Sequence, residues 1–121
     1  MSSIDRPLHA DVLLYGLDEE EEKATKPETL ERDGRSSRTL IKDGPLRVTL
    51  IVLAPGGGIP EHTAQGPVTI QPLRGEIEVV AGGEPHTVND RGLLAFEAGV
   101  PHSVRSDEGA AILLTVAFTD R

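Results

Sequence analysis

The stretch Gly56–Gly75, GGGIPEHTAQGPVTIQPLRG, decides how the rest of the chain is interpreted. It combines three consecutive glycines, a histidine at the expected start of a strand (His62) and the entry to a β-hairpin. The glycines do not indicate a phosphate-binding loop, because no helix beginning with Lys and Ser or Thr follows them. They predict a turn with unusual backbone angles instead. The stretch therefore predicts a site loop beside β-structure.

From Arg38 onward the chain consists of short β-rich segments separated by glycine and proline. Turns are predicted at 42–45, 81–85 and 89–92, where Gly, Asn or Asp can adopt a positive φ. Several short strands with turn signals between them favour an all-β sandwich or barrel. The predicted strand segments are SRTLIK, LRVTLIVLA, VTIQPL, EIEVVA, HTV, LLAFE, HSVR and AAILLTVAF.

Two of these segments are expected to be covered on both faces. Within 46–54, one face is apolar throughout, and the other begins with Arg47 and Thr49 and ends with Ile51 and Leu53. Such a segment is typical of a central strand that enters deep burial. The last segment, 110–118, is apolar except for Thr115, and a second subunit is one candidate for its outer cover.

Residues 1–35 differ from the rest of the chain. They contain the acidic run Asp18–Glu22 and the helix breakers Gly16 and Pro27. We expect a short helix around His9 to Tyr15 and a mobile acidic linker, followed by one barrel domain over 36–121. An acidic run is more often a solvated linker or helix face than an interaction site. We assign it no function.

Composition narrows the class of protein. A chain of 121 residues supports a single packed domain. With 20 acidic and 12 basic side chains the formal charge is −8, which argues against nucleic acid or an anionic membrane as partner. Without cysteine, histidine and carboxylate are the strong metal ligands that remain. The start of the sequence lacks the pattern of a signal peptide, so a cytoplasmic protein is expected.

The glycine-rich stretch resembles the first motif of the cupins, which are small jelly-roll barrels, also called double-stranded β-helices. That motif is G-x5-H-x-H-x3,4-E-x6-G, and Gly56, His62 and Gly75 match its spacing. Ala64 stands where the second histidine belongs, and Val68 stands where the glutamate belongs. The frame of the motif is kept, whereas two of its ligands are missing.

A second motif, G-x5-P-x-G-x2-H, is matched by Gly99 and His102, with Glu97 in place of the proline and Arg91 in place of the first glycine. The resemblance covers about 38–118 and implies a cupin-like barrel. It does not imply one activity, because cupins include dioxygenases, isomerases, decarboxylases, storage proteins and sugar- or effector-binding domains.

The resemblance implies a metal centre of three histidines and a carboxylate around Fe, Mn, Ni, Cu or Zn. Only His62 and His102 of that set are present. Further ligands would have to be several waters or other side chains, which are Gln65, Gln71, Glu61 and His86. If Val68 keeps the inward orientation of the glutamate it replaces, strand alternation turns Ile70 inward and Thr69 and Gln71 outward.

The pocket is predicted to be lined by His62, Ala64, Val68, Ile70 and His102. Each histidine could instead be a structural residue bonded to a backbone carbonyl, and His86 is interpreted as an exposed hairpin residue. Arg47, Arg74 and Arg105 could clamp a carboxylate, although single arginines on strands are usually surface residues. Ser103 cannot form a nucleophile and base pair with His102, because adjacent strand residues point to opposite faces.

Three functions follow from this reading. The first is a small cupin barrel, expected to be a homodimer, that binds a small molecule without a metal. The alternative is a metal-dependent dioxygenase- or isomerase-type cupin with a reduced ligand set, in which a divalent ion orients the substrate. The third is a structural or regulatory module that contacts another protein. The sequence leaves open whether the protein is an enzyme.

Overall fold

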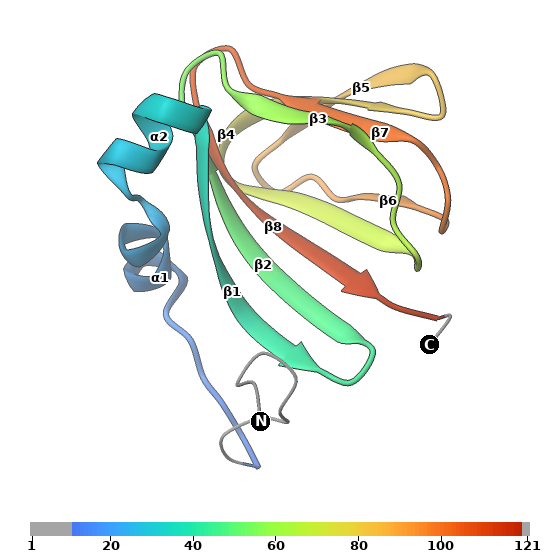
Figure 1. Cartoon of the computed structure of the whole chain (residues 1–121), viewed down its shortest axis with the longest axis horizontal. Helices are drawn as coiled ribbons and strands as arrows, with labels where there is room; N and C mark the ends of the chain where they lie inside the picture. The colour runs from blue at the N-terminus through green and yellow to red at the C-terminus, as the bar shows by residue number, and fades with distance from the viewer. Residues whose placement is uncertain (1–10, 120–121) are drawn as a thin grey trace.

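The computed structural model describes residues 11–119, which form a curled antiparallel sheet with two short helices on its outer side (Figure 1). The all-β, jelly-roll fold expected from the sequence is confirmed. The helices are α1 (Leu17–Ala24) and α2 (Pro27–Asp33). The strands are β1 (Arg35–Asp43), β2 (Leu46–Leu53), β3 (Gly58–His62), β4 (Val68–Ala81), β5 (Glu84–Asn89), β6 (Leu94–Phe96), β7 (His102–Arg105) and β8 (Ala110–Ala117).

Strand β4 joins two sheets into one half-barrel. Its first half pairs with β8 and β6 in the larger sheet, which also contains β1 and β2. Its second half pairs with β5 and β7 in the smaller sheet, to which β3 adds through β7. The segments VTIQPL and EIEVVA were expected to be separate strands. They form one 14-residue strand instead.

The bend of β4 has a local cause. The register with β8 shifts between Pro72 and Arg74, where a β-bulge lets the strand change direction. Gly75 follows with φ +86°, and a Cβ at this position would lie 2.6 Å from the carbonyl oxygen of Gly109. Both the backbone angle and the close contact require glycine here. The last glycine of the first motif is therefore the corner between the two sheets.

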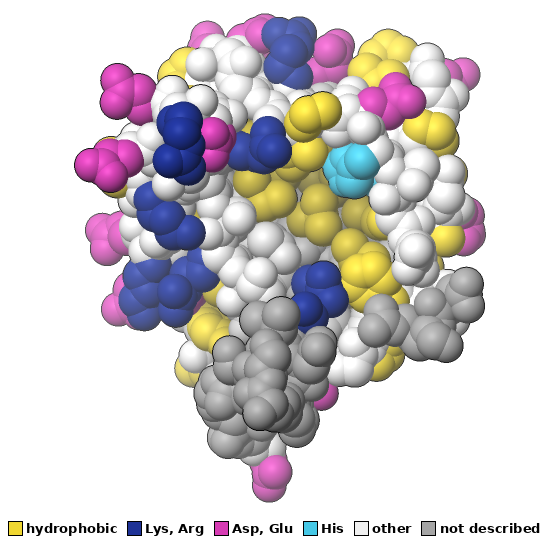
Figure 2. Space-filling view, viewed as in Figure 1, with side chains coloured by type: hydrophobic (Ala, Val, Ile, Leu, Met, Phe, Trp, Pro, Cys, Tyr) yellow, Lys and Arg dark blue, Asp and Glu magenta, His cyan; other side chains and the backbone are white. Residues whose placement is uncertain are grey.

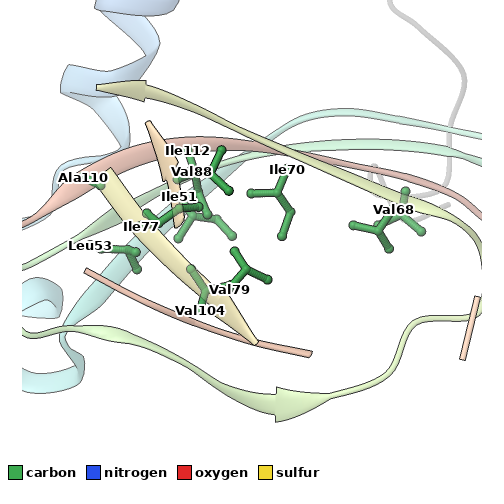
Figure 3. Packing of buried hydrophobic residues seen from close by; sticks show 11 residues of the cluster. Ile51, Leu53, Val68, Ile70, Ile77, Val79, Val88, Val104, Ala110 and Ile112 are labelled. Atoms are coloured by element: carbon green, nitrogen blue, oxygen red, sulfur yellow. The ribbon is translucent and has the colours of Figure 1, made fainter. Parts of the chain in front are cut away.

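The core lies between the two sheets and is aliphatic (Figure 3). On β2 the side chains of Ile51 and Leu53 point into this core, while Leu50 and Val52 point outward and pack beneath the helices with Ala24. The expected two-sided burial of 46–54 is thus present. Leu113 of β8 packs against this outer cluster, so part of the outer face of β8 is covered by the chain itself.

The acidic run is a helix rather than a linker. A short helix is expected around His9 to Tyr15. Residues 11–16 are not helical, so the prediction is wrong for Asp11 to Tyr15, and residues 1–10 lie outside the described residues. Helix α1 begins at Leu17, and Asp18, Glu19 and Glu20 occupy its first turn. Acidic side chains stabilise that end of a helix by interacting with its dipole.

Ion pairs attach this helix to the larger sheet. The carboxylate of Glu20 is buried and accepts a hydrogen bond from Nε of Arg38 at 2.7 Å, with Lys23 at 3.4 Å. Glu21 accepts a bond from Nε of Arg74 at 2.8 Å. The Arg38 bond, helped by Lys23, holds the pKa of Glu20 below its ordinary value of 4.5, although burial opposes this. The sequence-based interpretation as a mobile acidic segment missed this packing.

We predict that Glu20→Gln lowers the free energy of unfolding at pH 7 by about 1 to 3 kcal/mol, because a buried charge-assisted hydrogen bond to Arg38 is lost. Urea denaturation measures the change. Glu22→Gln removes an exposed charge from the same helix and should change stability by less than about 0.5 kcal/mol. Equal effects of the two substitutions would contradict a specific role for Glu20.

The contribution of Glu20 also fixes a pH dependence. Because its pKa is lowered in the folded chain, its stabilisation is present above the unfolded value near 4.5 and disappears as the pH falls through the folded value. The stability difference between wild type and Glu20→Gln should therefore shrink below about pH 4.5.

Candidate functional site

The two motif histidines meet at one end of the smaller sheet. His62 ends β3 and His102 begins β7, and the two residues are directly paired across these antiparallel strands. Paired residues present their side chains on the same face. The ring centroids are 4.1 Å apart, with an angle of 59° between the ring planes. The sequence pattern predicted that His62 begins a strand, whereas in the structure it is the last residue of β3.

Backbone carbonyls orient both imidazole rings. Nδ1 of His62 lies 2.9 Å from the carbonyl oxygen of Pro60, and Nδ1 of His102 lies 2.9 Å from that of Val100. A carbonyl can only accept a hydrogen bond, so each Nδ1 carries the proton. In a neutral ring the other nitrogen, Nε2, then holds a lone pair and can accept a hydrogen bond or bind a metal.

The two histidines differ in exposure. His62 is exposed, whereas His102 is 1% exposed and its ring lies 4.5 Å from the ring of Phe96. Burial lowers the pKa of His102 below 6.5, and the charge that His62 can carry lowers it further. The bond to Val100 acts in the opposite direction and is outweighed. His102 is therefore a neutral acceptor at pH 7.

The apolar residues of the predicted pocket are next to the core. Val68 and Ile70 are buried and point inward on β4, while Gln71 is exposed, as strand alternation predicted. Ala64 packs against the same core cluster. Its carbonyl oxygen accepts a hydrogen bond of 3.0 Å from the backbone N–H of Gly99. This bond joins the loop of the first motif to the turn of the second.

The second motif is kept in the backbone as well. Arg91, which stands where the motif has glycine, has φ +74°, the one positive φ of a non-glycine residue among 11–119. Arg91 thus adopts a left-handed conformation, which is uncommon for a residue other than glycine. In the first motif, the φ of Gly56 is also positive. Gly58 is instead required by packing, since a Cβ there would lie 2.2 Å from the carbonyl oxygen of Val104.

Three of the four suggested additional ligands have exposed side chains. Gln71 faces outward, and Gln65 and Glu61 are exposed. His86 is within β5, paired with Val79, and is half-buried rather than exposed. Within 11–119 no group of three or more His, Cys, Asp or Glu side chains is arranged to hold a metal ion. The donor set near this pair is two imidazoles, fewer than the three protein ligands of a typical catalytic site.

The candidate arginines separate into two kinds. Arg74 pairs with Glu21, and Arg105 pairs with Glu78 and Asp107, so both are surface ion-pair residues. Arg47 points into the half-barrel, where its guanidinium carbon lies 4.7 Å from the centroid of the Phe118 ring. The sequence-based interpretation underestimated Arg47. The inward orientation of Arg47 could have been predicted from strand alternation, which places Arg47 on the same face as Ile51 and Leu53.

A surface concavity lies away from the histidines. It is a surface cleft of about 640 Å³ lined by polar and charged side chains, including Glu76, Asn89 and Asp90. Arg74 and Arg105 also border it and are held there by carboxylates. We assign the candidate site to the half-barrel, because that is where oriented imidazoles meet apolar walls. Figure 2 shows one face of the molecule, with hydrophobic side chains gathered in its middle and histidine and basic side chains at their border.

Comparisons with known proteins agree with this fold. The family model described as "Cupin domain" matches residues 49–117. A conserved protein of unknown function from Streptococcus pyogenes is 27% identical, with a TM-score of 0.69, and the match covers 100% of this chain and 98% of that one. A cupin superfamily protein from Desulfitobacterium hafniense is 16% identical, with a TM-score of 0.68, over 70% of this chain and 78% of that one.

One larger enzyme is similar in fold. Salicylate 1,2-dioxygenase from Pseudoaminobacter salicylatoxidans has a TM-score of 0.74 at 17% identity. The match covers 85% of this chain and 32% of the dioxygenase, so the likeness concerns one part of that enzyme and shows the fold alone. No curated protein matches the chain significantly. Within the part of the chain that is described, no helix is long and apolar enough to cross a membrane.

We predict that the pKa of His102, measured by the chemical shift of its ring protons, lies below 6.5. In His62→Gln it should rise, because the repulsion from His62 is removed, and stay below the ordinary value, because burial is the larger cause. As the pH falls from 6.5 toward the lowered pKa, the unfolded chain binds a proton that folded His102 does not, so stability is lost in that window. A pKa at or above 6.5 in the wild type would contradict the buried neutral ring.

Proposed function

Because the chain belongs to the cupin family and its half-barrel is apolar beside two oriented imidazoles, we propose that it binds a small molecule there, with His62 and His102 at the polar end. The observation that carries the proposal is the pairing of the two rings at 4.1 Å beside Phe96 and the apolar interior. Both Nδ1 atoms are used by backbone carbonyls, which leaves the Nε2 atoms for the ligand.

The protonation state of this pair favours a particular ligand group. A neutral imidazole that is protonated on Nδ1 accepts a hydrogen bond at Nε2. The group that meets His102 is therefore a donor, such as a hydroxyl or an amine N–H. Val68 and Ile70 supply apolar surface for the remainder of the ligand. A mostly apolar cavity with few oriented polar groups is the usual design of a small-molecule site.

The metal centre implied by the cupin motifs does not fit the side chains that are present. Ala64 and Val68 have no lone pair to offer, and Gln71 lies on the opposite face of β4. Two imidazoles alone leave the coordination sphere short of a protein ligand. Binding without a metal is therefore the function that these residues support best.

A metal-dependent cupin enzyme, of the dioxygenase or isomerase type, is the second candidate. It is favoured by one observation, the convergence of two imidazoles whose Nε2 atoms are both available. The two candidates differ in a simple measurable property, which is the amount of divalent metal that the purified chain holds.

We expect protein purified without an affinity tag or chelator to contain far less than one Fe, Mn, Ni, Cu or Zn per chain by elemental analysis, because it offers too few ligands. Supplementation with each divalent ion should not change this. Stoichiometric metal that is lost in both His62→Ala and His102→Ala would contradict binding without a metal and favour the enzyme.

The binding proposal has its own test with phenol, an uncharged apolar probe that carries a hydroxyl donor. Phenol should shift the ring resonances of His102 saturably, and His102→Ala should weaken phenol binding about 5- to 10-fold, as expected for one hydrogen bond. His86→Asn, which changes a histidine outside the pair, should leave phenol binding unchanged. Equal binding by His102→Ala and wild type would place the site elsewhere.

A further inference from the structure

We infer that Arg47 is an anion-recognition residue inside the half-barrel, and that the bound molecule carries a carboxylate opposite the end that meets the histidines. This inference rests on the proposed function, since it names the chemical class of the molecule bound at the same site. It depends on four features of Arg47, which are its position, its surroundings, its unsatisfied nitrogen and the charge of the rest of the chain.

Strand pairing in the larger sheet places Arg47 in one row of side chains with Phe96, whose ring contacts His102. Arg47 of β2 pairs with Val116 of β8, Val116 pairs with Val68 of β4, and Val68 pairs with Phe96 of β6. Residues paired across antiparallel strands have their side chains on the same face, so the whole row points inward. Phe96 contacts the ring of His102. Arg47 and Phe96 are therefore at opposite ends of one row of side chains, and His102 adjoins the Phe96 end.

The next inward-facing row forms the floor between these ends. At the positions two residues away on each strand, β2 is again paired with β8, β8 with β4 and β4 with β6. Most of its side chains are apolar and pack with the core, and the members are Thr49, Leu114, Ile70 and Leu94. A molecule above this floor thus has apolar contacts below it and polar groups at its two ends.

The spacing of strands limits the size of that molecule. Arg47 and Phe96 are separated by three strand spacings, or about 14 Å along the curved sheet. Both side chains extend inward from this backbone separation, so less space remains between their ends. A molecule that bridges this distance would have the size of a single ring or a short aliphatic chain with a polar group at each end.

Among residues 11–119 no carboxylate forms an ion pair with the guanidinium of Arg47. Four of the six other described arginines are paired with acidic side chains, namely Arg32, Arg38, Arg74 and Arg105. Arg47 instead lies over the ring of Phe118. Such a cation–π contact fixes the plane of the guanidinium and leaves its N–H edge available to an acceptor.

One donor of that edge is buried without a partner. Nε of Arg47 is a buried side-chain nitrogen, and within 11–119 it has no hydrogen-bond partner. Leaving a buried donor unsatisfied costs about 1 to 3 kcal/mol, and a charged donor costs more. A carboxylate can accept two parallel hydrogen bonds from a guanidinium and would satisfy this nitrogen. A buried Nε without a partner, in a chain of net negative charge, supports binding of an anion from outside.

Binding of benzoate, compared with its uncharged isostere benzamide, tests the inference. In the wild type we expect benzoate to bind at least about 10-fold more tightly than benzamide, because only benzoate forms charge-assisted bonds to the guanidinium. The Nε–H resonance of Arg47 in a ¹H–¹⁵N spectrum, identified by its disappearance in Arg47→Lys, should shift on addition of benzoate.

Substitutions test whether the preference for benzoate depends on Arg47 or on another arginine. In Arg47→Gln the ratio of benzoate to benzamide affinity should fall to about 1, and in Arg32→Gln, which removes an exposed ion-paired arginine, it should stay at the wild-type value. Arg47→Lys keeps the charge without the two-pronged geometry, and an intermediate ratio is expected. If Arg47→Gln does not fold, the Lys variant and the wild-type Nε–H shift still decide the question.

The phenol measurement distinguishes failure of this inference from failure of the proposed function. If phenol binds near His102 while benzoate and benzamide bind equally well to the wild type, the half-barrel is a binding site and the role of Arg47 is wrong. A benzoate preference that persists in Arg47→Gln would also overturn the inference. If none of the three probes binds, the proposed function fails and the inference fails with it.

Discussion

The continuity of β4 through a bulge and a glycine corner is the constraint on which the half-barrel depends. Because one strand belongs to both sheets, its alternation of side chains sets the inner face of each. Val68 and Ile70 point inward before the corner, and Ile77 and Val79 do so after it. A shift of one residue at the bulge would turn one of these pairs outward. The bend at Pro72 to Gly75 therefore decides which side chains can face a ligand.

The same strand pairing converts an ordinary substitution into a change of chemistry. Val68 occupies the position of a motif carboxylate and is buried between Val116 and Phe96 in the sheet. A carboxylate there would lie in an apolar environment and would need a cation as partner. With valine in that place, the environment of His102 loses a negative charge that would have favoured its protonated form. The missing carboxylate thus acts in the same direction as burial, which is the main cause of the lowered pKa of His102.

The sequence was sufficient for the fold and for part of the site, and the reasons are local. Motif spacing predicted that His62 and His102 would converge, because positions in register on neighbouring strands are fixed by turn length and alternation. The inward orientation of Val68 and Ile70 followed from the same alternation. The acidic helix was not predicted, since its order comes from the buried pair of Glu20 with Arg38, a contact 18 residues apart in sequence. Strand β3 was missed because its glycines are selected by close packing and look like a turn.

The environment of the Arg47 side chain could not be predicted from the sequence, for a different reason. Alternation correctly placed it on the face of Ile51 and Leu53, yet a single arginine near the start of a strand usually snorkels to water. What distinguishes Arg47 is the ring of Phe118, which comes from the far end of β8 and lies over the guanidinium only when the sheet is formed. That contact keeps the cation inside, where the dielectric constant is lower and an anion interacts with it more strongly. In the proposed site, a molecule with a donor at one end and an anion at the other would bind in one orientation, because the donor would meet the neutral imidazole and the anion would meet the guanidinium.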